Sequence, residues 1–184
     1  QQSRRVALQW SKKIFAALIL TWPFFLFPSA HAADVEISEV AWMGTANSTA
    51  DEWMELKDKT SSGLDLAGWR LEWSGGTKGV TFDSEKCVNT TIAAGGYFLL
   101  ERTDDTSVTG VSADCIFTGA LVNSGEILEL KNASGTVIDR IDASGGWPAG
   151  SNSTKETMQK NSAGAWITAA ATPRAPTAEI LPPP

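Results

Sequence analysis

The chain has 184 residues with 21 acidic and 15 basic side chains, a net charge of −6. All the acids follow residue 33 but only 11 basic residues do, so this part carries 11 − 21 = −10. A surface of that charge repels phosphate backbones, which argues against a nucleic-acid-binding protein.

The N-terminal segment has the pattern of a secretory signal. Four basic residues precede an apolar run at residues 14–27, and an A-x-A pattern follows. We predict a helical signal peptide over residues 1–32, cleaved after Ala32. The alternative is an uncleaved membrane anchor. Pro23 and Pro28 argue against it, because they interrupt a run already shorter than the ~20 residues of a membrane span.

After the signal, short apolar runs alternate with turn residues, and no window has a helical period. A break in the first run predicts a bulge near Glu39, and Asn132–Gly135 predicts the turn of a hairpin. This pattern is typical of an all-β sandwich or barrel. The predicted strands are residues 35–42, 53–57, 68–73, 96–102, 126–131, 136–142 and 165–169.

The chain ends in a proline-rich stretch that favours an extended linker. We therefore divide it into the signal peptide, a domain at residues 34–173 and a linker or tail at residues 174–184. A chain ending on three prolines suggests that the native protein continues past Pro184; the alternative is a frayed natural terminus. Membrane attachment would require an uncleaved signal or a segment beyond Pro184.

Two cysteines, Cys87 and Cys115, lie in the predicted exported part. They admit one intramolecular pairing, and an oxidising compartment permits it. We predict a disulfide; two free buried thiols are the alternative.

The single histidine, His31, lies beside the predicted cleavage site. The domain thus lacks the usual Ser-His-Asp and Cys-His nucleophiles and histidine-based metal sites. Carboxylate chemistry remains, although ordinary solvated acids explain the same residues better. We predict a non-enzymatic protein. The acids considered for a glycosidase pair are Asp51, Glu52, Glu55, Asp104 and Asp105.

A calcium site is a second and weaker hypothesis for the acidic residues. Asp104 and Asp105 occupy a predicted turn, and Asp114 follows downstream. Oxygen ligands suit Ca²⁺, but the spacing is not that of an EF-hand. We expect no cofactor, with Ca²⁺ as the alternative.

Tryptophans could form a sugar-binding platform or pack in the core. Trp73 shares a face with leucine, which favours the core. Trp53 shares a face with Glu55 and Lys57, so we predict that it is exposed. Trp53, Glu55 and Trp147 are therefore the candidate binding residues.

Several motifs in order resemble the bacterial lamin tail domain over residues 34–173. They are VEISEVAWMG, DEWMEL, LDLAGWRL, GYFLLER, NSGEILELKNASGTVID, GGWPAG and W-x-TAAATP. The resemblance implies an immunoglobulin-like β-sandwich and an accessory module of secreted or membrane-attached proteins, alone or beside hydrolases such as nucleases. It supplies no catalytic residue. Family members commonly end in TPG-x-PN, where this chain has TPRAPT at Thr172–Thr177.

Strand alternation also predicts which face of the sheet each side chain of DEWMEL occupies. Met54 and Leu56 should face the core while Trp53 and Glu55 face outward, and Glu52 should lie on the face opposite Glu55. This separation argues against a catalytic carboxylate pair.

These observations predict an exported, non-enzymatic module for protein–protein contact, anchoring or adhesion at the cell envelope. The partner would be a protein or an envelope glycan, in a secreted, periplasmic or cell-surface location. The alternatives are a carbohydrate-binding module and a targeting module of a larger secreted hydrolase or nuclease. The expected contact loops are residues 43–51, 74–80, 103–113 and 143–160.

Overall fold

The computed structural model describes residues 34–177. The predicted signal peptide and His31 lie outside the described residues, as do residues 178–184. Within residues 34–177, no helix has the length and apolar character needed to cross a membrane.

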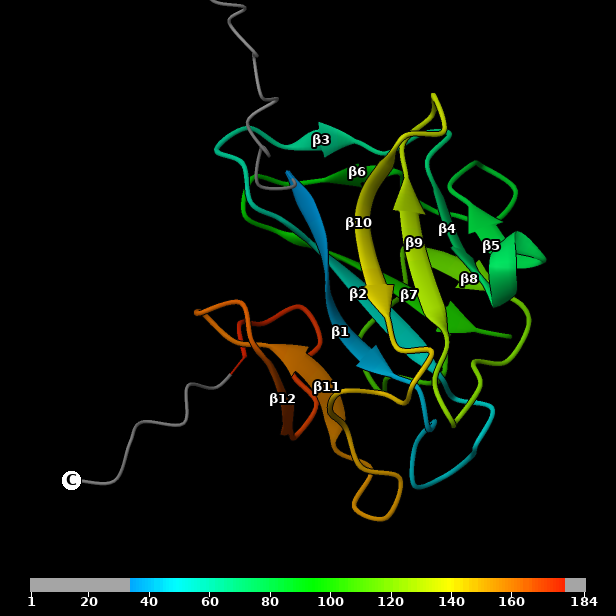
Figure 1. Cartoon of the computed structure of the whole chain (residues 1–184). Coiled ribbons are helices and arrows are strands. Elements are labelled where there is room, and N and C mark those ends of the chain that lie inside the picture. Colours follow the sequence, from blue (N-terminus) through cyan, green and yellow to red (C-terminus); the bar gives the residue numbers. More distant parts are fainter. Residues whose placement is uncertain (1–33, 178–184) are drawn as a thin grey trace, which may run out of the picture. The chain divides into compact units, whose positions relative to one another are not determined.

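Six strands form the larger of two facing sheets (Figure 1). Neighbouring strands are antiparallel except β7 and β8, which run parallel and are joined through the loop at residues 103–113. In order across the sheet they are β12 (Trp166–Ala169), β11 (Thr157–Lys160), β1 (Val35–Ala41), β2 (Trp53–Asp58), β7 (Tyr97–Arg102) and β8 (Cys115–Phe117).

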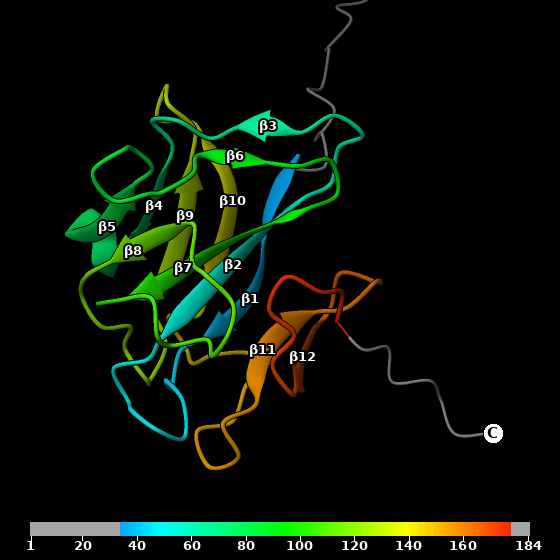
Figure 2. The ribbon, with the colours of Figure 1, turned by 180° about the vertical axis from the view of Figure 1, so that it is seen from behind.

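Four antiparallel strands form the second sheet, which lies in front of β2 and β7 in Figure 1 and behind them in Figure 2. Its order is β10 (Val137–Asp142), β9 (Ile127–Lys131), β4 (Arg70–Trp73) and β5 (Lys78–Thr81). A short 3-10 turn, η1 (Ser74–Gly76), links β4 to β5, and a small pair of β3 (Leu64–Asp65) and β6 (Thr91–Ile92) lies at one end.

The hydrophobic core fills the space between the two sheets. Trp73 of β4 is 1% exposed and meets Phe117 of β8 edge-on, with ring centroids 5.3 Å apart. Phe82 and Phe98 pack at 5.2 Å. Because side chains alternate along each strand, the sheets bury one complete face each. The fold is thus the all-β, immunoglobulin-like sandwich predicted from the sequence.

The bulge predicted near Glu39 is present. The pairing of β1 with β2 shifts between Ile37 and Glu39, and Ser38 is the extra residue. A bulge inserts one extra residue, so the side chains that follow it point to the opposite faces of the sheet from those that regular alternation would give. As a result Ile37 and Val40 are both fully buried among the apolar residues, while Glu39 is released to the other face.

The long strands and the disulfide agree with the sequence predictions. All seven predicted strands are present within two residues of their predicted bounds, and β9 and β10 pair as the expected hairpin. Phe98, Leu99 and Leu100 are fully buried, as predicted for a strand covered on both sides. Cys87 and Cys115 form the predicted disulfide.

The strands that sequence reasoning missed are short or polar. β3 and β6 have two residues each, and β11 contains only one apolar residue, Met158. Two expected loops were wrong in part, because residues 74–80 include the start of β5 and residues 143–160 include β11. These strands are stabilised by their neighbours in the sheet and carry no apolar alternation of their own.

Candidate binding site

The outer face of the six-stranded sheet, directed away from the second sheet, carries most of the unusual chemistry. Glu39 of β1 lies opposite Glu55 of β2, and on its other side opposite Gln159 of β11. All three side chains are at most 2% exposed. Two carboxyl groups are therefore buried side by side on a face that alternation would expose to water.

The C-terminal segment, residues 170–177, covers these carboxyl groups. The Thr172 N–H and hydroxyl group donate to the two oxygens of Glu39 at 3.1 and 3.0 Å. The Arg174 N–H donates to Glu55 Oε2 at 2.6 Å. The Gln159 side-chain amide donates to the Ala170 carbonyl at 2.6 Å, which fixes the start of the segment. The domain's own chain thus occupies the place where a substrate of a carboxylate pair would bind.

Burial changes the protonation of this pair. It raises the pKa of Glu55 to about 8; the Arg174 N–H opposes the rise, and the Glu39 carboxyl adds to it. Burial also raises the pKa of Glu39, against the donors Thr157 and Thr172. Desolvation disfavours the charged form of a carboxyl, so Glu55 is mainly neutral at pH 7.

Arg174 fastens the segment at a second point. Its guanidinium donates to Asp114 Oδ2 at 2.7 Å and to the Ser112 carbonyl at 2.8 Å. Its φ of 57° lies in the left-handed region, which favours glycine. The side-chain contacts hold a backbone conformation that an arginine seldom adopts.

Trp53 and Glu55 are buried, which corrects the prediction that Trp53 is an exposed aromatic residue. Trp53 is 2% exposed and Glu55 is 1% exposed. Alternation assigned the correct face, but two chain segments cover it. Glu101, which pairs with Trp53 in β7, accepts the Ser107 N–H at 2.7 Å, so the loop at residues 103–113 folds over this part of the sheet.

Trp147, the other candidate aromatic residue, is half-buried. Its ring stacks on Trp42 with centroids 6.1 Å apart, and its Nε1–H donates to the Val122 carbonyl at 2.9 Å. Trp147 therefore fixes the loop after β10 against the body of the domain.

The aspartates of the calcium hypothesis have separate partners. Asp114 accepts the Leu99 N–H as well as Arg174, and Asp105 accepts the Ala113 N–H at 2.7 Å. Asp104 accepts the Thr106 hydroxyl. Residues 34–177 contain no group of three or more acids, histidines or cysteines placed to hold a metal ion.

Asp51 and Glu52 are likewise apart from the Glu39–Glu55 pair. Asp51 accepts the Thr45 hydroxyl at 2.7 Å. Glu52 accepts the Leu121 N–H at 2.8 Å and faces Arg102 at 3.4 Å. The carboxyl pair that does form, Glu39 with Glu55, was not predicted. The bulge near Glu39 was the one sequence signal that could have located it.

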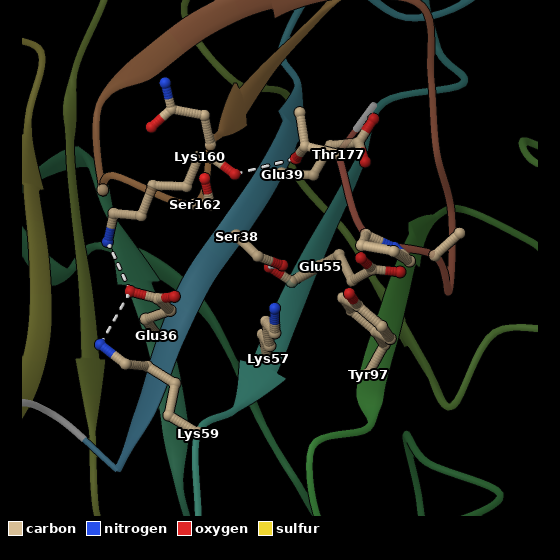
Figure 3. Close-up of a pocket in the computed structure, with 14 residues that line it drawn as sticks. Glu36, Ser38, Glu39, Glu55, Lys57, Lys59, Tyr97, Lys160, Ser162 and Thr177 are labelled. Carbon is tan, nitrogen blue, oxygen red and sulfur yellow. Dashed lines mark hydrogen bonds and ion pairs between the residues drawn. The ribbon is translucent and has the colours of Figure 1, made fainter. Parts of the chain in front are cut away.

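One part of the outer face remains hollow (Figure 3). This outer-face cavity has a volume of about 480 Å³ and lies beside the end of the C-terminal segment. Its charged rim consists of Glu36, Lys57, Lys59 and Lys160, with Tyr97 in the wall. Glu36 pairs with Lys59 at 3.4 Å and with Lys160 at 3.2 Å.

The edges of the six-stranded sheet differ. At one edge of the sheet, the segment around Cys87 lies along the free side of β8. The Ile116 N–H donates to the Lys86 carbonyl there at 2.8 Å. At the other end, β12 is the last strand, and its residues Trp166–Ala169 are uncharged and half-buried to exposed. β12 therefore presents an edge that is open to strand pairing within the described part of the chain, where the Gly150 N–H donates to the Thr168 hydroxyl at 2.8 Å.

One family model, the Lamin Tail Domain, matches residues 28–145 of this chain. The chain belongs to the lamin tail domain family. A comparison with curated protein sequences finds no match. The family supports a non-enzymatic β-sandwich module.

Several features of this lamin tail domain lie beyond the matched residues. β11, β12 and the C-terminal segment all follow residue 145, yet they complete the larger sheet and cover its outer face. Arg174 stands where the family pattern commonly has glycine, which fits its left-handed φ. Arg174 in place of glycine therefore keeps the backbone conformation of the turn and adds a positively charged side chain to it.

Proposed function

We propose that this lamin tail domain is an exported, non-enzymatic module that makes protein–protein contacts at the cell envelope, in an anchoring or adhesive role. The open edge of β12 carries the proposal. Strand edges are usually protected by charges, bulges or covering segments, because their free N–H and C=O groups pair with other chains. β12 has no charged residue, whereas the edge strand β10 has a bulge and carries Asp139, Arg140 and Asp142.

An edge of this kind recognises a partner by strand addition, in which main-chain hydrogen bonds supply affinity and alternate side chains supply specificity. Trp166 and Ile167 are both half-buried and would supply such side-chain contacts. The partner is then an extended segment of an envelope protein. The disulfide supports an oxidising compartment.

A cysteine cross-linking experiment tests the contact. Both native cysteines are in the disulfide, so Thr168→Cys adds a single thiol to the exposed part of β12. Val137→Cys on β10, at a residue that is 44% exposed, is the matched control. With a short thiol-reactive photo-cross-linker in envelope preparations, Thr168→Cys should give a discrete adduct that the control does not give.

A blocking variant makes the result decisive. Thr168→Lys places a charge on the edge and should abolish capture of the partner identified by cross-linking, whereas Val137→Lys should not. Equal adducts from both thiols, or unchanged capture by Thr168→Lys, would rule out β12 as the contact strand.

The alternative, a carbohydrate-binding module, cannot use Trp53 as an exposed aromatic platform, because that side chain is buried.

A further inference from the structure

The outer-face cavity gathers three of the domain's lysines. Three ammonium groups, those of Lys57, Lys59 and Lys160, stand around it, and Glu36 lies between those of Lys59 and Lys160 (Figure 3). Glu36 is shared by Lys59 and Lys160, and the Lys160 ammonium also lies 3.6 Å from an Asp139 carboxylate oxygen. The domain as a whole is strongly acidic, so three lysines gathered around one cavity are a distinct feature.

Lys57 is the cation without a carboxylate. No ion pair of Lys57 occurs within residues 34–177. Its ammonium lies 5.6 Å from the centre of the Tyr97 ring, and Glu39 and Glu55 line the cavity beside it. Those two carboxyl groups accept hydrogen bonds from the C-terminal segment, and burial raises the pKa of both. Because its pKa is raised to about 8, the Glu55 carboxyl balances little of the Lys57 charge at neutral pH.

The remaining wall combines polar side chains with Ala175 and Pro176. Asn161 and Ser162 come from the turn after β11, and Thr177 from the C-terminal segment. The Thr177 hydroxyl donates to the Lys160 carbonyl at 2.8 Å, and the Asn161 side-chain oxygen accepts two backbone N–H groups of its own turn. The Asn161 amide nitrogen, the Ser162 hydroxyl and the Tyr97 ring remain to contact a ligand.

We propose that the outer-face cavity binds an acidic saccharide, with the sugar carboxylate at Lys57 and the sugar ring against Tyr97. Hydroxyl and amide groups around an aromatic ring suit a sugar, and an ammonium with no carboxylate partner suits its acid group. A peptide carboxylate would also satisfy Lys57, but the apolar part of the lining is small, since beside Tyr97 and Gly164 it consists of Ala175 and Pro176. The volume lies within the range of small-molecule sites and is large enough for one or two sugar rings.

The proposed ligand contacts Lys57 and Tyr97 lie on β2 and β7, away from the edge strand β12. The failure of this site therefore leaves the proposed contact function standing, and the reverse is also true. The test uses the full chain in NMR titrations with galacturonic acid, its disaccharide, neutral galactose, acetate and inorganic phosphate. The acidic sugars should shift the signals of Lys57, Tyr97 and Ser162 and bind at least about tenfold more tightly than galactose or acetate, the size of effect that one charge-assisted hydrogen bond supplies.

Lys57→Met keeps the aliphatic stem and should weaken binding of the acidic sugars about tenfold. Lys86→Met, at an exposed lysine outside the cavity, is the matched control and should bind as the native chain does. Melting temperatures of both variants show that the fold is kept.

Three results would overturn the proposal. The first is the absence of shifts at the cavity residues with either acidic sugar. The second is equal binding of galactose or phosphate, which would show a site with no preference for an acidic sugar. The third is unchanged binding by Lys57→Met.

Discussion

The two outer faces of the sandwich look alike in the sequence and differ in the structure. On the four-stranded sheet, Glu72 pairs with Arg70 at 2.6 Å and with Lys131 at 2.7 Å, on a face partly open to water. On the six-stranded sheet, Glu39 and Glu55 are buried beneath the chain's own C-terminal segment. Alternation thus identifies which side chains point outward, and only the complete fold decides which of them meet water.

The protonation of the two faces differs in the same way. The hydrogen bond from Lys131 lowers the pKa of Glu72. Burial raises the pKa of Glu55 to about 8. An open face stabilises its carboxylates as ions by pairing them, whereas the covered face keeps a carboxyl group neutral because it excludes water.

The largest expected effect concerns Trp53. Because Trp53 is buried on the covered face, Trp53→Ala should lower the free energy of unfolding by about 3–5 kcal/mol. Val137→Ala on the second sheet, at a residue that is 44% exposed, should change it by less than about 0.5 kcal/mol. Urea unfolding measures both. A loss at Trp53 no greater than that at Val137 would mean that the outer face is open.

The next effect is the pH dependence of Glu55. A carboxyl whose folded pKa is raised contributes stability that is complete below about pH 4.5 and is lost as the pH rises towards 8. Glu55→Gln should therefore be nearly neutral at pH 4.5 and should stabilise the domain at pH 8, by on the order of 3 kcal/mol. Urea unfolding from pH 4.5 to 8 measures this difference.

Glu85→Gln, at an exposed residue, is the matched control and should leave the pH profile of the native chain unchanged. If Glu55→Gln gave that same profile, burial of the Glu55 carboxyl would be wrong.

The third effect separates the side chain of Arg174 from its backbone. Arg174→Ala removes the partner of the buried Asp114 and should cost about 1–2 kcal/mol. Arg174→Gly loses the same contacts but accepts a φ of 57° more readily, so it should be more stable than Arg174→Ala by about 1 kcal/mol. Thermal unfolding compares them. Equal stability of the two variants would exclude the left-handed conformation.

The smallest effect belongs to the open face. Glu72→Gln should cost at most about 1 kcal/mol at pH 7, as is usual for ion pairs that water reaches. Since the pKa of Glu72 is lowered, this contribution is present above its unfolded pKa and is lost as the pH falls, the reverse of Glu55. Unfolding at pH 3 and pH 7 checks the sign, and a cost that grew on acidification would contradict it.

Much of the fold could be predicted because its signals are local. Alternation located the long strands, the break near Glu39 marked the bulge, and two cysteines allowed one pairing. The covered face could not be predicted, because its contacts join distant residues. Arg174 meets Glu55 across 119 positions, and Thr172 meets Glu39 across 133.

The central claim is that the C-terminal segment buries the carboxyl group of Glu55. An NMR titration of the Glu55 side-chain carboxyl carbon in the full chain tests it directly. We predict a titration midpoint near pH 8, because burial raises the pKa of this group to about 8. A midpoint near the ordinary value of 4.5 would show that water reaches the carboxyl and would contradict the account.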